Sequence, residues 1–178
     1  MKQPTKGGRP SVAKKSFMRP KVSKKEAEEF GPGKTDIVFC GECGIVYFNK
    51  AWHHNLRNYK FLNDEKAVGF RLCPACQMQK DRRYEGEIRV AGVAKSDAKS
   101  LEEFVRALSR KAYEIDPLTR ILKVALKGNV FSIFTSDNQF TQRLAKKMKE
   151  THKKLFTAPE IHKGKEGDFF IIMMQYLK

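Results

Sequence analysis

Apolar residues recur at helical spacing in two stretches of the second half of the chain. The first stretch opens with the capping box Ser100-Leu-Glu-Glu103, which predicts a helix that begins there. The apolar positions of this helix are Leu101, Phe104, Val105, Leu108 and Ala112, and Asp116-Pro117 ends it. The second stretch predicts a helix over about residues 138–154, with Phe140, Leu144 and Met148 as its buried stripe.

The segment between these helices has the alternating pattern of strands. RILKVALK and VFSIFT flank Gly128-Asn129, which predicts a hairpin with a two-residue turn. The expected register pairs Leu126 with Phe131, Val124 with Ile133 and Leu122 with Thr135. We also expect a connecting strand at 87–94 and two last strands near 159–163 and 168–177. Residues 85–178 are therefore expected to form a small α-β-β-α-β-β sandwich of the α+β class with an antiparallel sheet.

The four cysteines of the chain form two C-x-x-C pairs within residues 36–84. Cys40 and Cys43 make the first pair, and Cys73 and Cys76 follow after an interval of 29 residues. Strands are expected at 45–48 and 68–72, and Gly44 fits a turn that needs positive φ. Two such turns can direct four sulfurs at one metal ion, which predicts a closed, structural zinc ribbon. Redox-active dithiols are disfavoured, because no βαβ pattern surrounds either pair.

The charge of the chain is one-sided. It has 36 Lys and Arg against 20 Asp and Glu, a net charge of +16. Nucleic acid is the leading candidate partner for such a surface, and an anionic membrane surface is second. Residues 1–35 alone carry ten basic and three acidic residues, a net of 10 − 3 = +7. This segment is expected to be a disordered basic tail, either a solubilising one or an arm that binds along phosphates.

The basic residues are interleaved with aromatic ones around the cysteines and concentrated on the second helix. Such mixtures suit single-stranded or structured RNA. The candidate RNA-binding residues near the cysteines are Trp52, His53, His54, Arg57, Lys60, Arg71, Lys80, Arg82 and Arg83. Those on the second helix and just after it are Arg143, Lys146, Lys147, Lys153 and Lys154. A partly buried structural role for Trp52 and a surface role for the two histidines remain open.

The sequence shows no motif of a common catalytic site and no signal for secretion or membrane insertion. It contains no phosphate-binding glycine loop, no nucleophile elbow and no H-E-x-x-H motif. We therefore expect a protein that is not an enzyme and has no small-molecule substrate. No apolar run is long enough for a membrane helix, and no secretory signal is evident, so a cytoplasmic protein is expected.

Several motifs resemble a family of short bacterial zinc-ribbon proteins, themselves similar to the export adaptors of the large ribosomal subunit. The likeness lies in Cys40–Tyr47, Trp52, the run from Cys73 to Glu87, the stretch Asp116–Ile121 and the basic residues 143–147. It implies a metal role for Cys40, Cys43, Cys73 and Cys76, and ribosomal RNA or a ribosomal subunit as partner. The adaptors carry more C-x-x-C pairs and further domains, so the resemblance does not imply export.

A second resemblance is to rubredoxin, an iron electron carrier. The pattern C-x-x-C-G-x-x-Y followed by C-P-x-C is shared, although Gln77 stands where rubredoxin has Gly and the loop here is basic. Thiolate sites accept both zinc and iron, so the sequence leaves iron open. The sequence as a whole predicts a non-catalytic, zinc-braced RNA-binding protein that associates with ribosomes or their precursors, in assembly, translation control or dormancy. A rubredoxin-like carrier and a protein-binding zinc-ribbon adaptor are the alternatives.

Overall fold

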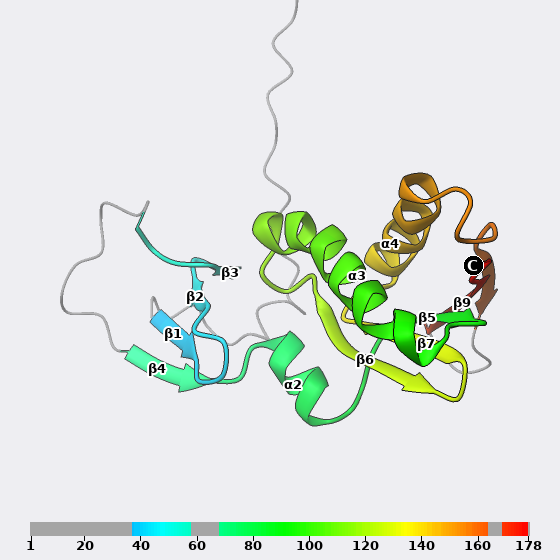
Figure 1. Cartoon of the computed structure of the whole chain (residues 1–178). Coiled ribbons are helices and arrows are strands. Elements are labelled where there is room, and N and C mark those ends of the chain that lie inside the picture. The colour runs from blue at the N-terminus through cyan, green and yellow to red at the C-terminus, as the bar shows by residue number, and fades with distance from the viewer. Residues whose placement is uncertain (1–36, 58–67, 164–168, 178) are drawn as a thin grey trace, which may run out of the picture. The chain divides into compact units, whose positions relative to one another are not determined.

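The computed structural model describes residues 37–57, 68–163 and 169–177. The predicted tail at 1–35 lies outside these residues. The described residues belong to one compact unit. In chain order the elements are β1 (Ile37–Cys40), β2 (Val46–Phe48), β3 (Ala51–His53), β4 (Val68–Arg71), α2 (Pro74–Lys80), β5 (Gly86–Ala91), α3 (Lys95–Ile115), β6 (Ile121–Lys127), β7 (Val130–Thr135), α4 (Asn138–Thr151), β8 (Glu160–Lys163) and β9 (Phe170–Gln175) (Figure 1).

The strands form two mostly antiparallel sheets, as expected for the α+β class. The first has the order β3-β2-β1-β4 and the second the order β6-β7-β5-β9-β8. Each sheet contains one parallel pair, β1 with β4 and β5 with β9. The α+β region, residues 86–177 in its described parts, therefore has a mixed sheet where we expected an antiparallel one.

Strand β5 is the centre of the second sheet and not a connecting strand. It lies between β7 and β9, and the side chains of Ile88 and Val90 are fully buried. Helices α3 and α4 lie together on one face of this sheet (Figure 1), and their buried residues join Ile88 and Val90 in one core cluster. One layer of two helices thus covers one face of the five-stranded sheet, and the main core lies between the layers.

Helix α3 begins earlier than its capping box indicates. It starts at Lys95, with Ala94 as an N-cap that makes no side-chain hydrogen bond, so the prediction of a start at Ser100 is wrong. Two residues before the predicted start stabilise the extra turn. Ala98 packs against the main core, and the acid Asp97 interacts favourably with the helix dipole in the first turn. The helix ends at Ile115, with Asp116 as its C-cap, which confirms the end predicted from Asp116-Pro117.

The hairpin of β6 and β7 confirms most of the predicted register. Leu126 pairs with Phe131 and Val124 with Ile133, but Thr135 pairs with Ile121 and not with Leu122. A β-bulge between Ile121 and Lys123 causes this shift. The bulge adds one residue to the strand, so Leu122 leaves the face it would otherwise share with Val124.

Helix α4 begins at Asn138, as predicted, and ends at Thr151, three residues before the predicted limit. Asp137 caps its first turn by accepting from the amide of Phe140. Its buried residues include the expected stripe of Phe140, Leu144 and Met148. In the last turn of the helix, the ammonium of Lys149 donates at 2.6 Å to the carbonyl of Lys153, which lies just beyond the helix end.

Candidate metal centre

The first cysteine pair lies on a tight turn between β1 and β2. Cys40 ends β1, and its amide donates to the carbonyl of Ile45 at 2.8 Å. The amide of Gly44 donates back to the carbonyl of Cys40 at 3.0 Å, and Gly44 has a φ of 73°. This confirms the left-handed turn predicted from Gly44 and brings the two sulfurs to the same end of the strand.

The second pair lies at the start of a helix that the sequence reading missed. Cys73 is the N-cap of α2, Pro74 is its first residue, and the sulfur of Cys73 accepts from the amide of Cys76 at 3.4 Å. Proline suits this position because its missing N–H has no helical partner there. The amide of Cys73 also donates to the sulfur of Cys40 at 3.3 Å, so a sulfur of each pair accepts a hydrogen bond from a backbone amide of the second pair.

The four sulfurs have the spacing of a tetrahedral metal site. All four lie within 4.8 Å of one another, and the sulfurs of Cys43 and Cys73 are 3.7 Å apart. Zinc–sulfur bonds of about 2.3 Å in a tetrahedron place two sulfurs roughly 3.8 Å apart. None of the four cysteines is in a disulfide. The residues therefore fit a metal ion held by Cys40, Cys43, Cys73 and Cys76.

The thiols differ in acidity because their surroundings differ. Burial raises the pKa of Cys40, but amide hydrogen bonds from Cys43, Cys73 and Glu42 outweigh it and give a pKa of about 6. Burial raises the pKa of Cys73, and burial together with the neighbouring thiols raises that of Cys76. A metal ion that binds here must displace protons from Cys73 and Cys76, so its binding releases protons.

A small apolar cluster surrounds the sulfurs. It contains Cys40, Ile45, Cys73, Ala75, Cys76 and Leu122, with Cys43, Trp52, Leu72, Met78 and Leu118 packed against it. Two of these residues, Leu118 and Leu122, come from the α+β region. The bulge that displaces Leu122 from the hairpin register thus gives this cluster one of its buried side chains.

Arg120, which the sequence reading did not assign to the site, reaches the sulfurs from between these two leucines. Its guanidinium donates to the sulfur of Cys73 at 3.4 Å, to that of Cys43 at 3.6 Å and to that of Cys76 at 3.9 Å. Burial lowers the pKa of Arg120, and the sulfurs of Cys43 and the other cysteines outweigh this and raise it overall. The stretch Asp116–Ile121 was part of the family resemblance, but no spacing rule could assign Arg120 to cysteines 44 or more residues away.

The aromatic candidates next to the cysteines make intramolecular contacts. Trp52 is half-buried with its ring 5.4 Å from that of Tyr47, and the guanidinium of Arg71 lies 5.0 Å from the Tyr47 ring and 5.8 Å from the Trp52 ring. A ring nitrogen of His53 is 3.0 Å from the carbonyl of Phe48. A ring nitrogen of His54 is 2.7 Å from the carbonyl of Tyr113 on α3, which links the β3 end to the α+β region. Arg57 is exposed, and Lys60 lies outside the described residues.

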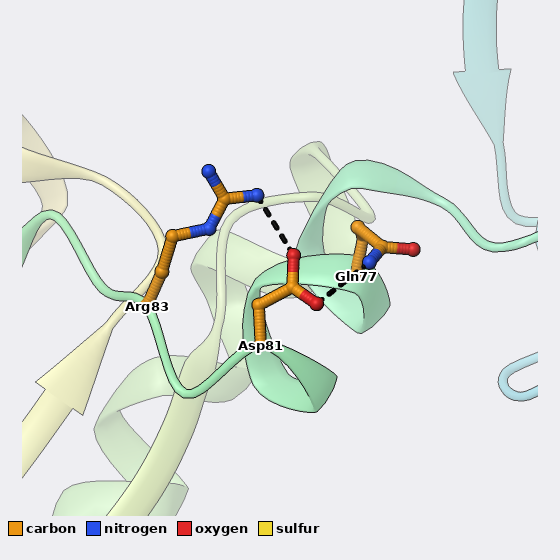
Figure 2. Close-up of polar contacts among 3 residues, drawn as sticks. All are labelled: Gln77, Asp81 and Arg83. Carbon is orange, nitrogen blue, oxygen red and sulfur yellow. Dashed lines mark hydrogen bonds and ion pairs between the residues drawn. The ribbon is translucent and has the colours of Figure 1, made fainter.

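The basic residues at the end of α2 and just after it surround one acid. Lys80, Arg82 and Arg83 are exposed, and Asp81 lies between them. Asp81 accepts a hydrogen bond from Gln77 and pairs with Arg83 (Figure 2), and both contacts are 2.8 Å long. The hydrogen bond from Gln77 and the charge of Arg83 hold the pKa of Asp81 below its usual range. Asp81 is therefore charged at neutral pH and offsets part of the local positive charge.

The basic candidates on α4 lie on its solvent side. Arg143, Lys146 and Lys147 are exposed, outside the buried stripe, and Lys153 and Lys154 are exposed just beyond the helix. Glu150 is the one acid in the helix sequence, 3.9 Å from the ammonium of Lys146. All five basic residues therefore lie on α4 or on the turn that follows it, and all are exposed.

Comparison with known proteins gives no family and no relative: no family model matches the sequence, and no curated protein matches it. Among the described residues, no helix combines the length and the apolar character needed to cross a membrane.

Proposed function

We propose that this chain is a non-catalytic, cytoplasmic RNA-binding protein in which zinc, held by the four cysteines, braces a ribbon beside a basic α+β region. Its partner would be ribosomal RNA, in a ribosomal subunit or a precursor. The metal part of the proposal rests on the sulfur geometry, and the RNA part rests on the charge.

The exposed side of α4 is the observation that carries the RNA proposal. Four of the fourteen residues of α4 are basic and one is acidic, whereas α3 has five basic and four acidic residues. A protein needs no such imbalance for solubility alone, because mixed charges serve that purpose as they do on α3. A phosphate backbone would neutralise the excess and release counterions.

Three further features fit an RNA partner. The exposed arginines after α2 can bind phosphates with a planar, two-pronged donor set. Residues 1–35 add a net charge of +7, which suits long-range attraction to a large polyanion. The likeness of Cys40–Tyr47 and Cys73–Glu87 to proteins related to ribosomal export adaptors favours the ribosome among RNA partners.

Zinc is the proposed ion because a closed shell of four thiols is typical of structural zinc sites, and because Gln77 and the basic loop depart from the rubredoxin pattern. Iron would turn the same site into an electron carrier. Metal analysis and an absorption spectrum of the purified protein separate the two, because ferric iron bound by four thiolates is coloured and zinc is not. A coloured protein that undergoes reversible one-electron reduction would support the rubredoxin-like alternative instead.

Sedimentation tests the ribosomal proposal directly. Tagged protein in cell lysate is centrifuged through a sucrose gradient at low and at moderate salt, with and without RNase. Co-migration with one subunit that persists at moderate salt and is lost with RNase is the expected result. Protein that remains at the top of the gradient in every condition would defeat the ribosomal proposal. RNase-resistant association with one protein would favour a protein-binding adaptor.

A further inference from the structure

Contacts with Ser136 and Tyr113 hold Arg120 in place. Its backbone amide donates to the hydroxyl of Ser136 at 2.9 Å, and its carbonyl accepts from the amide of Ser136 at 3.1 Å. The guanidinium also lies over the ring of Tyr113, 5.6 Å from its centroid. These contacts place the backbone of Arg120 beside the end of β7 and direct its side chain away from the main core.

Alternate residues of this segment face two different clusters. Leu118 and Leu122 pack against the cysteine cluster, whereas Ile121 belongs to the main core. Arg120 lies between the two leucines in sequence and contacts the same cluster through three sulfurs. Leu118, Arg120 and Leu122 thus face the cysteines, while Ile121 between them enters the main core.

Charge gives the guanidinium a function at this position. Four thiolates around a divalent ion carry more negative charge than the ion neutralises, and three of them are buried with little access to water. Arginine keeps its charge at any physiological pH and can donate several hydrogen bonds in one plane. Such bonds to thiolates are charge-assisted and are stronger than those between neutral groups.

We propose that Arg120 is a positioning residue of the metal centre: it donates hydrogen bonds to the ligand sulfurs, stabilises them as thiolates and slows release of the ion. This proposal rests on the metal site proposed above and is independent of RNA binding. It also assigns a role to the Asp116–Ile121 stretch, which the RNA proposal does not use. Because Arg120 belongs to the segment that enters β6, binding of the ion should also stabilise that edge of the five-stranded sheet.

The test compares Arg120→Gln and Arg120→Lys with Arg110→Gln in the full chain. Gln removes the charge, Lys keeps it without the planar donor set, and Arg110 is an exposed arginine on α3 that serves as the matched control. The first readout is the rate at which zinc passes to a chromogenic chelator. The second is the sulfur-to-metal charge-transfer absorption of the cobalt-substituted protein, which reports on the sulfurs themselves.

Arg120→Gln should release zinc at least about tenfold faster, the usual scale for loss of a group that supports metal ligands. Its cobalt charge-transfer band should move to lower energy, because sulfurs without these hydrogen bonds are more electron-rich. Arg120→Lys should lie between Arg120→Gln and the wild type, and Arg110→Gln should match the wild type.

Two results would overturn the proposal. One is an Arg120→Gln protein whose release rate and cobalt spectrum equal those of the wild type. The other is a change in both readouts that Arg110→Gln reproduces. If Arg120→Gln fails to fold, Arg120→Met takes its place, because Met keeps an apolar stem and has neither charge nor donor. Wild-type release and an unshifted band in that variant would equally remove the role. A wild-type protein that takes up neither zinc nor cobalt would instead defeat the metal site on which the proposal rests.

Discussion

Gly86 lies directly against Thr141, so that a Cβ built on Gly86 would come within 2.0 Å of the Thr141 hydroxyl oxygen. Gly86 begins the central strand β5, and Thr141 is fully buried in the first half of α4. Thr141 cannot easily turn away, because its hydroxyl donates to the carbonyl of Asp137 at 2.7 Å and is also hydrogen-bonded to that of Thr135. The contact sets how closely the helix approaches the sheet.

Gly86→Ala is therefore expected to destabilise the protein by about 3 kcal/mol, since an extra methyl in a filled site forces its neighbours apart. Chemical denaturation of the metal-loaded full chain measures the change. Gly69→Ala is the matched control on strand β4, where the new Cβ meets only Val38 at an ordinary 3.7 Å. Equal stability of the two variants would show that helix and sheet can separate at Gly86 at little cost.

Loss of one sulfur should remove the metal ion. Cys73→Ser is expected to lower the bound metal from about one ion per chain to nearly none, because a closed site needs all four thiolates. It should also open the region around β1–β4 to protease and weaken RNA binding, because this region has only a small apolar cluster of its own. Elemental analysis, limited proteolysis and an RNA titration measure the three effects.

Met78→Leu is the control for this prediction, since Met78 packs against the same cluster without offering a thiolate. It should keep its metal, because a Leu of similar volume usually costs less than about 1.5 kcal/mol. A metal-free Cys73→Ser protein that binds RNA as tightly as the wild type would separate the metal from RNA binding.

Charge reversal on α4 tests the RNA surface. Changing Lys146, Lys147, Lys153 and Lys154 to Glu lowers the net charge by eight, from +16 to +8. If all four contact phosphates, the slope of log affinity against log salt should flatten by about 3 for single-stranded RNA, at roughly 0.7 per contact. Titrations at several salt concentrations give this slope.

An equal charge change on α3 is the control. Lys95, Lys99, Arg110 and Lys111 are all exposed, and their change to Glu also gives +8. This variant should lose less affinity and keep more of the salt slope than the α4 variant. Identical slopes in the two variants would mean that net charge acts alone and that α4 is no special contact surface.

Removal of Asp81 should strengthen RNA binding. Asp81→Asn deletes the negative charge that pairs with Arg83 while leaving an oxygen that can accept from Gln77. Water screens an exposed ion pair of this kind, so we expect only about a twofold rise in affinity at low salt. The gain should shrink as salt rises, because added ions screen exposed charges.

The gain of Asp81→Asn over the wild type should stay constant across neutral and mildly acidic pH. The folded-state pKa of Asp81 is held low, so its charge persists until the pH falls well below the usual carboxylate range. Glu103→Gln, at an exposed position of α3, is the control for a general loss of one acid. If Glu103→Gln raises affinity as much as Asp81→Asn does, the arginines after α2 are not RNA contacts.

Much of the local structure follows from short-range patterns in the sequence. The stripe of Phe140, Leu144 and Met148 is buried as its spacing predicts, and the hairpin turn at Gly128 lies where expected. The pairing of β2 with β3 was missed because its turn, Asn49-Lys50, lacks the usual glycine although both residues have positive φ. Helix α2 was missed because seven residues are too few for a periodic signal.

The sequence by itself indicated a four-cysteine metal site and a strongly basic chain. The C-x-x-C spacing is a property of neighbouring residues, and the net charge is a sum over the whole sequence. Only the tertiary structure decided that β5 is central, that Leu122 leaves its strand register and that Arg120 reaches Cys43, Cys73 and Cys76. These features depend on contacts between residues 44 to 77 positions apart or on packing between elements. Hydrophobic periodicity records which side of an element is buried but not what buries it, so these contacts leave no local pattern to read.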